Sequence, residues 1–480
     1  MITRFSTAMS SSLAQQLADH LHRPDGQEDC CFVLWRPASG ASRTTAVLVD
    51  LVLPLADERI VHGTVDFTSQ YFLRSASAAA ESGCGVGLIH AHPGGRGWQP
   101  LNQIDHDAEA AFAAQALALT DQPLLGMTFA GGDAGHSARI WQRHGARNYR
   151  PLEAESVRVV GEQLAITFNE RFLPAPPTTT AQQRTVSAWG RQTQETLARL
   201  HVGVVGTGSV GMIIVEALAR TGIGRLTLFD FDAVETVNLD RLLHTTRLDA
   251  VLKRPKVKLA ARAARRAATA PGLRVSALET SVTEADGFAA AADCDVLFSC
   301  VDRPWPRHVL NLLAYAHHIP VVDGGVSVET RNGHLQGAEW RAHVAAPGRA
   351  CLECLGQYDS ADVPTERDGL LEDATYITGL STEHPLRRKE NVFAFSTAAA
   401  AAELAQFITM TAAPSGISDT GAHLYHLTTG TLDRREDGCY PGCPYDTTLN
   451  ALGDAAPVVT GRHLAAEQAR AAHRWLWSRR

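Results

Sequence analysis

A regular alternation of strand and helix patterns begins at Leu200 and constrains the fold more than any other feature of the sequence. The apolar run LHVGVV leads into a helical pattern over 209–220, and similar strand runs follow in RLTLFDFD, DVLFSCVD and IPVVDGG. Repeated strand–helix units form a parallel sheet with helices on both faces. The sequence therefore predicts a Rossmann-like, mostly parallel and doubly wound α/β domain.

The first 150 residues also mix strand and helix patterns, and they predict a separate mixed α/β domain. A Pro- and Thr-rich stretch over 172–185 separates the two halves, and a chain of 480 residues exceeds a single ordinary core. We expect a first domain over 1–165, a linker over 166–185, a second domain over 186–445 and a helical tail over 446–480.

The overall composition excludes several functional classes. The net charge is −7 with both signs mixed along the chain, which does not favour a nucleic-acid or anionic-membrane surface. No apolar run reaches the length of a membrane span, and the N-terminus lacks the apolar core of a signal peptide. The nine cysteines include two close pairs, a pattern of thiols and metal ligands rather than of a disulfide framework. We expect a cytoplasmic protein.

A glycine-rich turn predicts a nucleotide site at the start of the second domain. Gly206, Gly208 and Gly211 follow a strand and open a helix, where the backbone can approach a phosphate. Asp230 ends the next strand, where its carboxylate can bind ribose hydroxyls. These features alone fit a nicotinamide dehydrogenase equally well.

Charged residues after the later strands favour a triphosphate. The candidate set is Asp230, Asp232, Asn238, Arg241, Lys256 and Asp302. Cationic side chains that converge on a glycine-rich turn suit a triphosphate and its departing pyrophosphate. The carboxylates suit Mg²⁺ as well as ribose. An NAD(P)-dependent oxidoreductase has less need for such a cationic cluster.

This ordered set resembles the ubiquitin-activating family of ThiF/MoeB type. The resemblance covers about residues 186–445 and rests on the glycine turn, DFDAVETVNLDR, PKV and the late Asp302. It implies ATP- and Mg²⁺-dependent adenylation of the C-terminal glycine of a ubiquitin-like β-grasp protein. Arg241 and Lys256 would stabilise phosphate charge, and Asp302 would hold the Mg²⁺-phosphate or the attacking carboxylate. The segment WGRQTQ resembles the family's Arg finger, so Arg191 would reach the partner's ATP in a homodimer.

Four cysteines form two knuckles, Cys351–Cys354 and Cys439–Cys443, which can meet around one tetrahedral Zn²⁺. Buried unpaired thiols are the alternative, and we assign that role to the other five cysteines. The resemblance implies a structural zinc. Family members that form a thioester carry a cysteine after the first knuckle, but residues 355–438 contain none. The chain then stops at the adenylate, or Ser381 or Thr382 accepts an oxyester.

The segment GLIHAHPGGRGWQPLNQIDHD predicts a second metal site in the first domain. His90 and His92 lie two apart at a strand end and point to one face, and Asp105 begins the following helix. Two imidazoles, one carboxylate and an open position form a hydrolytic zinc site, for which Glu28 is the candidate general base. The alternative is that these are ordinary polar residues at a strand end whose hydrogen bonds are satisfied without a metal. If the register differs, His106 and Asp107 are possible substitutes at this site.

This pattern resembles the JAMM/MPN metalloproteases, over about residues 10–150. Three features depart from that family: Cys31 replaces a glycine, the His92–Asp105 segment is two residues longer, and Asn102 replaces the oxyanion-stabilising serine. An asparagine amide can also donate that hydrogen bond.

Together the two resemblances imply activation of a ubiquitin-like protein and its processing or removal from targets. Two bacterial settings fit: sulfur-carrier activation and trimming, and a ubiquitination-like conjugation pathway linked to antiviral defence, with a downstream conjugating enzyme. We prefer the second because no thiamine or molybdopterin signature accompanies the domains. An oxidoreductase and a non-catalytic scaffold that binds a ubiquitin-like partner remain the alternatives.

Overall fold

The computed structural model describes residues 2–145, 148–372, 390–436 and 438–478, which form two compact units. The first unit comprises Met1–Pro174 with two short later segments, Ala316–His318 and Thr448–Ala456. The second comprises Ala175–Tyr315, Ile319–Thr447 and Pro457–Arg480. The stretch expected to be a single tail, 446–480, is thus divided between the units, and its helix is α14 (Leu464–Ser478).

The first unit is a mixed α/β fold around one large sheet. Its strand order is β11-β10-β1-β3-β2-β6-β7-β8-β9. The elements are β1 (Phe5–Ser10), α1 (Ser11–Leu21), β2 (Cys30–Ser39), β3 (Thr44–Val52), β4 (Arg59–His62), β5 (Thr64–Phe67), α2 (Ser69–Glu81), β6 (Gly85–His92), α3 (Gln103–Thr120), β7 (Leu125–Ala130), β8 (Gly135–Arg143), β9 (Tyr149–Glu153), β10 (Ser156–Val160) and β11 (Leu164–Phe168).

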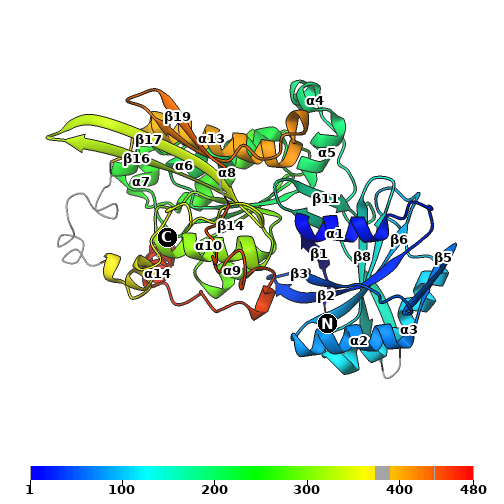
Figure 1. Cartoon of the computed structure of the whole chain (residues 1–480). Coiled ribbons are helices and arrows are strands. Elements are labelled where there is room, and N and C mark those ends of the chain that lie inside the picture. Colours follow the sequence, from blue (N-terminus) through cyan, green and yellow to red (C-terminus); the bar gives the residue numbers. More distant parts are fainter. Residues whose placement is uncertain (1, 146–147, 373–389, 437, 479–480) are drawn as a thin grey trace. The chain divides into compact units, whose positions relative to one another are not determined.

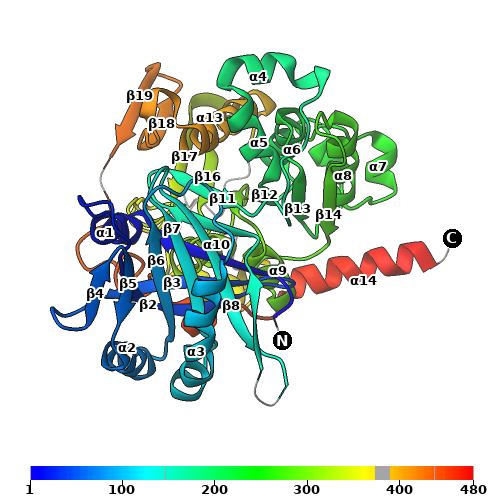
Figure 2. The same ribbon diagram turned by 90° about the vertical axis from the view of Figure 1, so that its right-hand side faces the viewer.

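Alternation along the central strands gives this sheet two apolar faces. On one face, Val33 and Ile89 pack with the apolar side of α1. On the other, Phe32 and Leu88 pack with α2 and α3, which lie together on that side in Figure 2. Because side chains two residues apart share a face, His90 and His92 of β6 lie on the same side as Leu88 and α3.

Two features of the first unit were not expected from the sequence. The strands β4 and β5 form a separate two-stranded hairpin between β3 and α2. The late segment Thr448–Ala456 belongs to this unit through Asp454, whose carboxylate accepts hydrogen bonds from Ser39 N (2.8 Å) and Ser39 Oγ (2.6 Å).

The second unit contains the predicted doubly wound sheet. Its strand order is β14-β13-β12-β15-β16-β17-β18-β19. The elements are α4 (Gln183–Trp189), α5 (Arg191–Arg199), β12 (His201–Val205), α6 (Ser209–Thr221), β13 (Arg225–Phe229), α7 (Arg247–Val251), α8 (Lys256–Ala267), β14 (Arg274–Leu278), α9 (Ala285–Ala292), β15 (Val296–Ser299), α10 (Pro304–Ala316), β16 (Val321–Arg331), β17 (His334–Ala345), α11 (Asp362–Arg367), α13 (Phe393–Ala412), β18 (Ala422–His426), β19 (Thr431–Arg435) and α14, with short 3₁₀ turns between some of them.

The strands β14 to β16 are parallel, and β17 to β19 extend the sheet antiparallel. The helices α6, α8 and α13 cover one face, and α9 and α10 lie on the other (Figure 1). The predicted fold class is therefore confirmed. Strands β13 and β14 are added on one side of β12 and strands β15 and β16 on the other, so the carboxyl ends of β12 and β15 form the switch point where such sheets bind ligands.

Helix α13 is long and apolar enough to cross a membrane by length and composition alone. In the structure it packs on β16, β17 and α6, and its residue Glu403 is fully buried. These are the contacts of a core helix.

Candidate functional sites

The glycine-rich turn is tightly packed at the end of β12. Gly206 has a φ of +89°, and a Cβ at this position would collide with the carbonyl of Cys300. A Cβ at Gly211 would collide with the carbonyl oxygen of Gly206. Gly208 is the N-cap of α6 and has open space around it. Gly206 and Gly211 therefore shape the turn, while Gly208 leaves the helix N-terminus open to a phosphate.

Asp230 ties the glycine turn to the end of β13. Its Oδ2 accepts hydrogen bonds from Thr207 N and Thr207 Oγ1, both at 2.8 Å. Its Oδ1 accepts one from Asp232 N, also at 2.8 Å. Burial raises the pKa of Asp230, an effect that the nearby Lys256 opposes. The Asp230 carboxylate thus holds the glycine turn in place. Ribose binding by the same carboxylate stays a prediction from the sequence.

Lys256 lies among three carboxylates at the same edge of the sheet. Its Nζ contacts Asp232 Oδ2 at 2.8 Å. Burial acts against the charged amine, but the attraction of Asp230, Asp232 and Asp302 raises the pKa of Lys256 overall. Asp302 is exposed and follows β15, which pairs with β12. The charged Lys256 amine and three carboxylates therefore lie close together beside the glycine turn.

The other predicted nucleotide residues make local contacts. Asn238 Oδ1 accepts a hydrogen bond from Glu235 N (3.0 Å), so it caps its own turn. Arg241 donates to Val237 O (2.6 Å) and to Asp240 Oδ1 (2.8 Å) within the same loop. Arg191 is exposed at the first position of α5. Phosphate contacts by these residues stay predictions.

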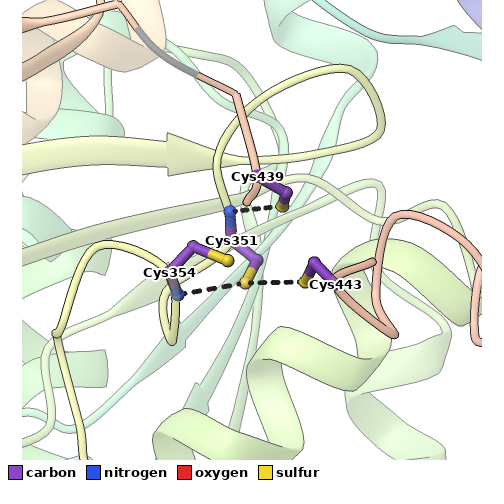
Figure 3. Close-up of side chains that lie close together, drawn as sticks. All are labelled: Cys351, Cys354, Cys439 and Cys443. Atoms are coloured by element: carbon purple, nitrogen blue, oxygen red, sulfur yellow. Dashed lines mark hydrogen bonds between the residues drawn. The ribbon is translucent and has the colours of Figure 1, made fainter. Parts of the chain in front are cut away.

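The two cysteine knuckles come together as the spacing predicts (Figure 3). The four sulfurs lie within 4.8 Å of one another, and Cys351 Sγ is 3.8 Å from Cys443 Sγ. Backbone N–H groups of Cys351 and Cys354 point at sulfurs, of Cys439 (3.2 Å) and Cys351 (3.3 Å) respectively. The hydrogen bond with Cys439 and burial raise the pKa of the Cys351 thiol. Four thiols at this spacing fit a tetrahedral zinc ion.

Ser381 and Thr382, the candidate oxyester acceptors, lie outside the described residues. The five remaining cysteines form no disulfide in the described structure, and all but Cys300 are buried.

In the first unit the structure brings His90, His92 and Asp105 together. The Asp105 Oδ2 atom is 3.2 Å from His90 Nε2 and 3.5 Å from His92 Nε2. Burial disfavours the ionised carboxyl, but the two imidazoles hold the pKa of Asp105 well below its usual range. His106 and Asp107 contact each other at 3.1 Å, and the His106 ring lies against Trp141. The register therefore brings Asp105 rather than its neighbours to the two histidines.

These three residues fit a zinc ion. His90 Nε2 and Asp105 Oδ2 are buried and lie 3.2 Å apart, but no aligned hydrogen bond engages either atom among the described residues. His92 Nδ1 lies 3.3 Å from Gln99 Oε1, which accepts its proton and leaves Nε2 free to bind a metal. Two imidazole nitrogens and one carboxylate oxygen are common zinc ligands. Sequence reasoning missed Gln99, although a polar residue in the loop after H-x-H was available as a signal.

Asn102 and Glu28 flank this cluster in different ways. Asn102 is the N-cap of α3, because its Oδ1 accepts a hydrogen bond from Asp105 N at 2.9 Å. The side-chain amide Nδ2 is the group that remains as a donor. The hydrogen bond with Asp105 raises the pKa of His92, and the half-buried Glu28 is close enough that its charge acts in the same direction.

The residues on both sides of Glu28 are held by the β4–β5 hairpin. Asp29 is 1% exposed, and Arg59 Nη1 donates to both of its oxygens, at 2.7 and 2.9 Å. Gln27 Oε1 accepts a hydrogen bond from Gly63 N at 2.8 Å. The carbonyl of Asp29 accepts from Ala91 N (2.9 Å), between the two histidines. The loop of Glu28 is thus fixed relative to His90 and His92.

The fold is a doubly wound α/β sheet with a glycine turn at its switch point, and the four clustered cysteines could hold a metal ion. Residues 180–433 match the ThiF family model, just over half of the chain, and the chain belongs to this family. The matched range leaves residues 1–179 unassigned.

Curated relatives share the same region. Ubiquitin-like modifier-activating enzyme 5 of Drosophila willistoni is 31% identical over 166 residues, covering 32% of this chain and 38% of the relative. Molybdopterin-synthase adenylyltransferase of Escherichia coli K12 is 34% identical over 164 residues, covering 34% and 61% respectively. The chain thus spans less than two thirds of the length of either relative. Among solved structures, E. coli MccB with succinimide aligns with a TM-score of 0.43 and 19% identity over 55% of this chain and 74% of MccB.

Proposed function

We propose that this chain adenylates the C-terminal glycine of a ubiquitin-like protein. The observation that carries the proposal is the convergence of Lys256 and three carboxylates on the glycine turn at the switch point of the sheet. Membership of the ThiF family favours adenylation over hydride transfer, because curated relatives are named as modifier-activating and adenylyltransferase enzymes.

In the proposed reaction a carboxylate oxygen of the terminal glycine attacks the α-phosphorus of ATP. The bond from that phosphorus to the bridging oxygen breaks, and pyrophosphate leaves with the electron pair. The turn N–H groups and Lys256 stabilise the charge that moves onto the phosphates. Mg²⁺ held by Asp232 or Asp302 would screen the same charge. Arg191, exposed on α5, would act on the partner's phosphates in a homodimer.

ATP–pyrophosphate exchange tests this proposal, using small β-grasp proteins that end in glycine. We expect carrier-dependent exchange in the wild type and its loss in Lys256→Ala and Asp302→Ala. Lys253→Ala is the matched control, because this nearby lysine pairs with Glu235 (3.1 Å) at the exposed surface. Nicotinamide binding without exchange would instead support an oxidoreductase, and zinc without nucleotide binding would support a scaffold.

We also propose that the first unit is a JAMM-type zinc peptidase that trims this protein or releases it from conjugates. The cluster of His90, His92 and Asp105, whose candidate ligand atoms lie within 4.8 Å of one another, supports this proposal. Zinc held by His90, His92 and Asp105 would polarise the scissile carbonyl and activate water. Glu28 would take the proton and pass it to the leaving amine, and the Asn102 amide would donate to the carbonyl oxygen.

Metal content and cleavage test the second proposal separately. We expect two zinc ions per wild-type chain by mass spectrometry, one in His92→Ala and one in Cys443→Ser. Glu28→Gln should keep both ions and lose cleavage of a ubiquitin-like precursor or conjugate. Zinc at the first site with no cleavage of any ubiquitin-like substrate would contradict the peptidase proposal. The pathway we propose is a bacterial ubiquitination-like pathway that attaches a small protein to targets. It would be linked to antiviral defence and would include a downstream conjugating enzyme.

A further inference from the structure

The end of the chain returns to the ligand-binding edge of the second sheet. Trp305 Nε1 donates to Val459 O (2.8 Å), and Gly461 N donates to Thr283 O (2.9 Å). Trp305 follows β15 and Thr283 follows β14. Residues 459–461 therefore contact the segments that follow β14 and β15, although they are outside the range matched by the family model.

Ion pairs on α14 hold this segment in place. Arg470 donates to both oxygens of Glu284, at 2.6 and 2.7 Å, and the contacting side chains are mostly shielded from solvent. His473 Nδ1 lies 2.8 Å from Glu279 Oε2. Glu279 and Glu284 both follow β14. The middle of α14 is thus attached to the loop after β14 at two points, through Arg470 and His473.

An aromatic cluster of Phe231, Trp305 and His463 forms where this segment meets the sheet. The His463 ring is parallel to Trp305, with centroids 5.7 Å apart and an interplanar angle of 2°. It is tilted against Phe231, with centroids 4.8 Å apart. Phe231 lies between Asp230 and Asp232, so the cluster begins one residue from the carboxylate that ends β13.

The position of this cluster relative to the glycine turn indicates its ligand. In a doubly wound sheet the phosphates lie at the glycine turn and the ribose at the carboxylate ending the second strand. The base then extends beyond that carboxylate, away from the phosphates. Purine faces stack favourably on aromatic side chains. We propose that His463, whose segment is held by α14, closes the base end of the nucleotide site by contacting the adenine.

This inference rests on the proposed adenylation function, and it assigns a role to a part of the chain that the family model does not cover. Base recognition can be separated from phosphate recognition by comparing ATP with inorganic tripolyphosphate, which has no base. Isothermal titration calorimetry on the full chain would give both dissociation constants.

The variants are His463→Ala, His463→Phe and Arg470→Ala. We expect His463→Ala to weaken ATP binding about tenfold, the scale of one lost stacking contact, and to leave tripolyphosphate binding unchanged. His463→Phe should retain most of the ATP affinity. Arg470→Ala removes none of the three aromatic side chains but loosens the segment that carries His463. It should therefore also weaken ATP binding. Arg462→Ala is the matched control, because its ion pair with Glu467 is exposed and on the same segment.

Three outcomes would overturn the inference. If His463→Ala and Arg462→Ala give the same ratio of ATP to tripolyphosphate affinity, His463 does not contact the base. If His463→Ala tightens ATP binding, the ring blocks the base position instead of lining it. If the wild type binds neither ligand, the adenylation proposal fails and this inference fails with it. Binding by the wild type separates these failures: the first outcome requires a wild type that binds ATP, whereas in the last outcome the wild type binds neither ligand.

Discussion

A buried ion pair beneath the histidine site gives a quantitative prediction. Glu109 lies one turn after Asp105 on α3 and is 1% exposed. Its Oε2 accepts hydrogen bonds from Arg139 Nε (2.8 Å) and Trp141 Nε1 (2.7 Å), and its Oε1 accepts from Arg139 Nη2. The helix that carries Asp105 is therefore fixed to β8 by a carboxylate with three donors.

Replacement of Glu109 by Leu leaves the Arg139 charge buried with Thr128 Oγ1 (3.0 Å) as its remaining hydrogen-bond acceptor. Breaking one side of a buried pair costs about 3–5 kcal/mol of folding free energy. For a unit of this size that corresponds to a fall in Tm of roughly 10 °C. Replacing both partners, Glu109→Leu with Arg139→Met, removes the uncompensated charge and should restore most of the lost stability.

Differential scanning calorimetry on the four proteins of this double-mutant cycle measures the effect. Hydrogen exchange over 103–143 assigns the transition to the first unit. We also expect the single variants to bind zinc more weakly at the histidine site, because a displaced α3 moves Asp105. The reasoning is refuted if the double variant loses as much stability as the two single variants added together, since the partners would then be energetically independent.

Two further predictions concern the glycine turn and acid stability. Gly211→Ala should lower Tm and abolish ATP binding, because its Cβ would collide with Gly206 O, whereas Gly208→Ala should leave Tm unchanged, as thermal unfolding would show. Burial lowers the pKa of His136 and of His343 to about 4. An unfolded histidine titrates near 6.5, so the unfolded chain binds more protons between these values. The free energy of unfolding should be highest above pH 6.5 and fall as the pH decreases toward 4, and urea titrations at pH 7.5, 6 and 5 would detect this; a flat profile would contradict it.

Much of the second unit could be predicted because its strands are continuous apolar runs bounded by glycine turns. The first strand of the first unit, FSTAMS, escaped prediction because half of its buried residues are polar. The expected linker over 166–185 contains the unit boundary after Pro174, but α4 already begins at Gln183. Weak periodicity in a Pro- and Thr-rich stretch concealed this short helix.

The candidate sites divide in the same way. Strand parity places His90 and His92 on one face, and each cysteine pair has a metal-ligand spacing, but the meeting of the two pairs, 88 positions apart, is set by the fold. Asn102 was read as an oxyanion donor, yet its position before Gln-Ile-Asp is also a helix N-cap signal that could have been recognised. The Arg59–Asp29 pair joins residues 30 positions apart, and no local pattern reports such a contact.

The membership of Thr448–Ala456 in the first unit has a consequence for how the gene can be divided. A polypeptide ending at residue 174 would lack Asp454, and Ser39 would lose the acceptor of two hydrogen bonds. It would also lack the His318 carbonyl, to which Arg158 donates at 3.1 Å. A recombination event that exchanged the first 174 codons alone would therefore transfer an incomplete domain. The two halves are expected to be inherited, and to be expressed successfully, as one reading frame.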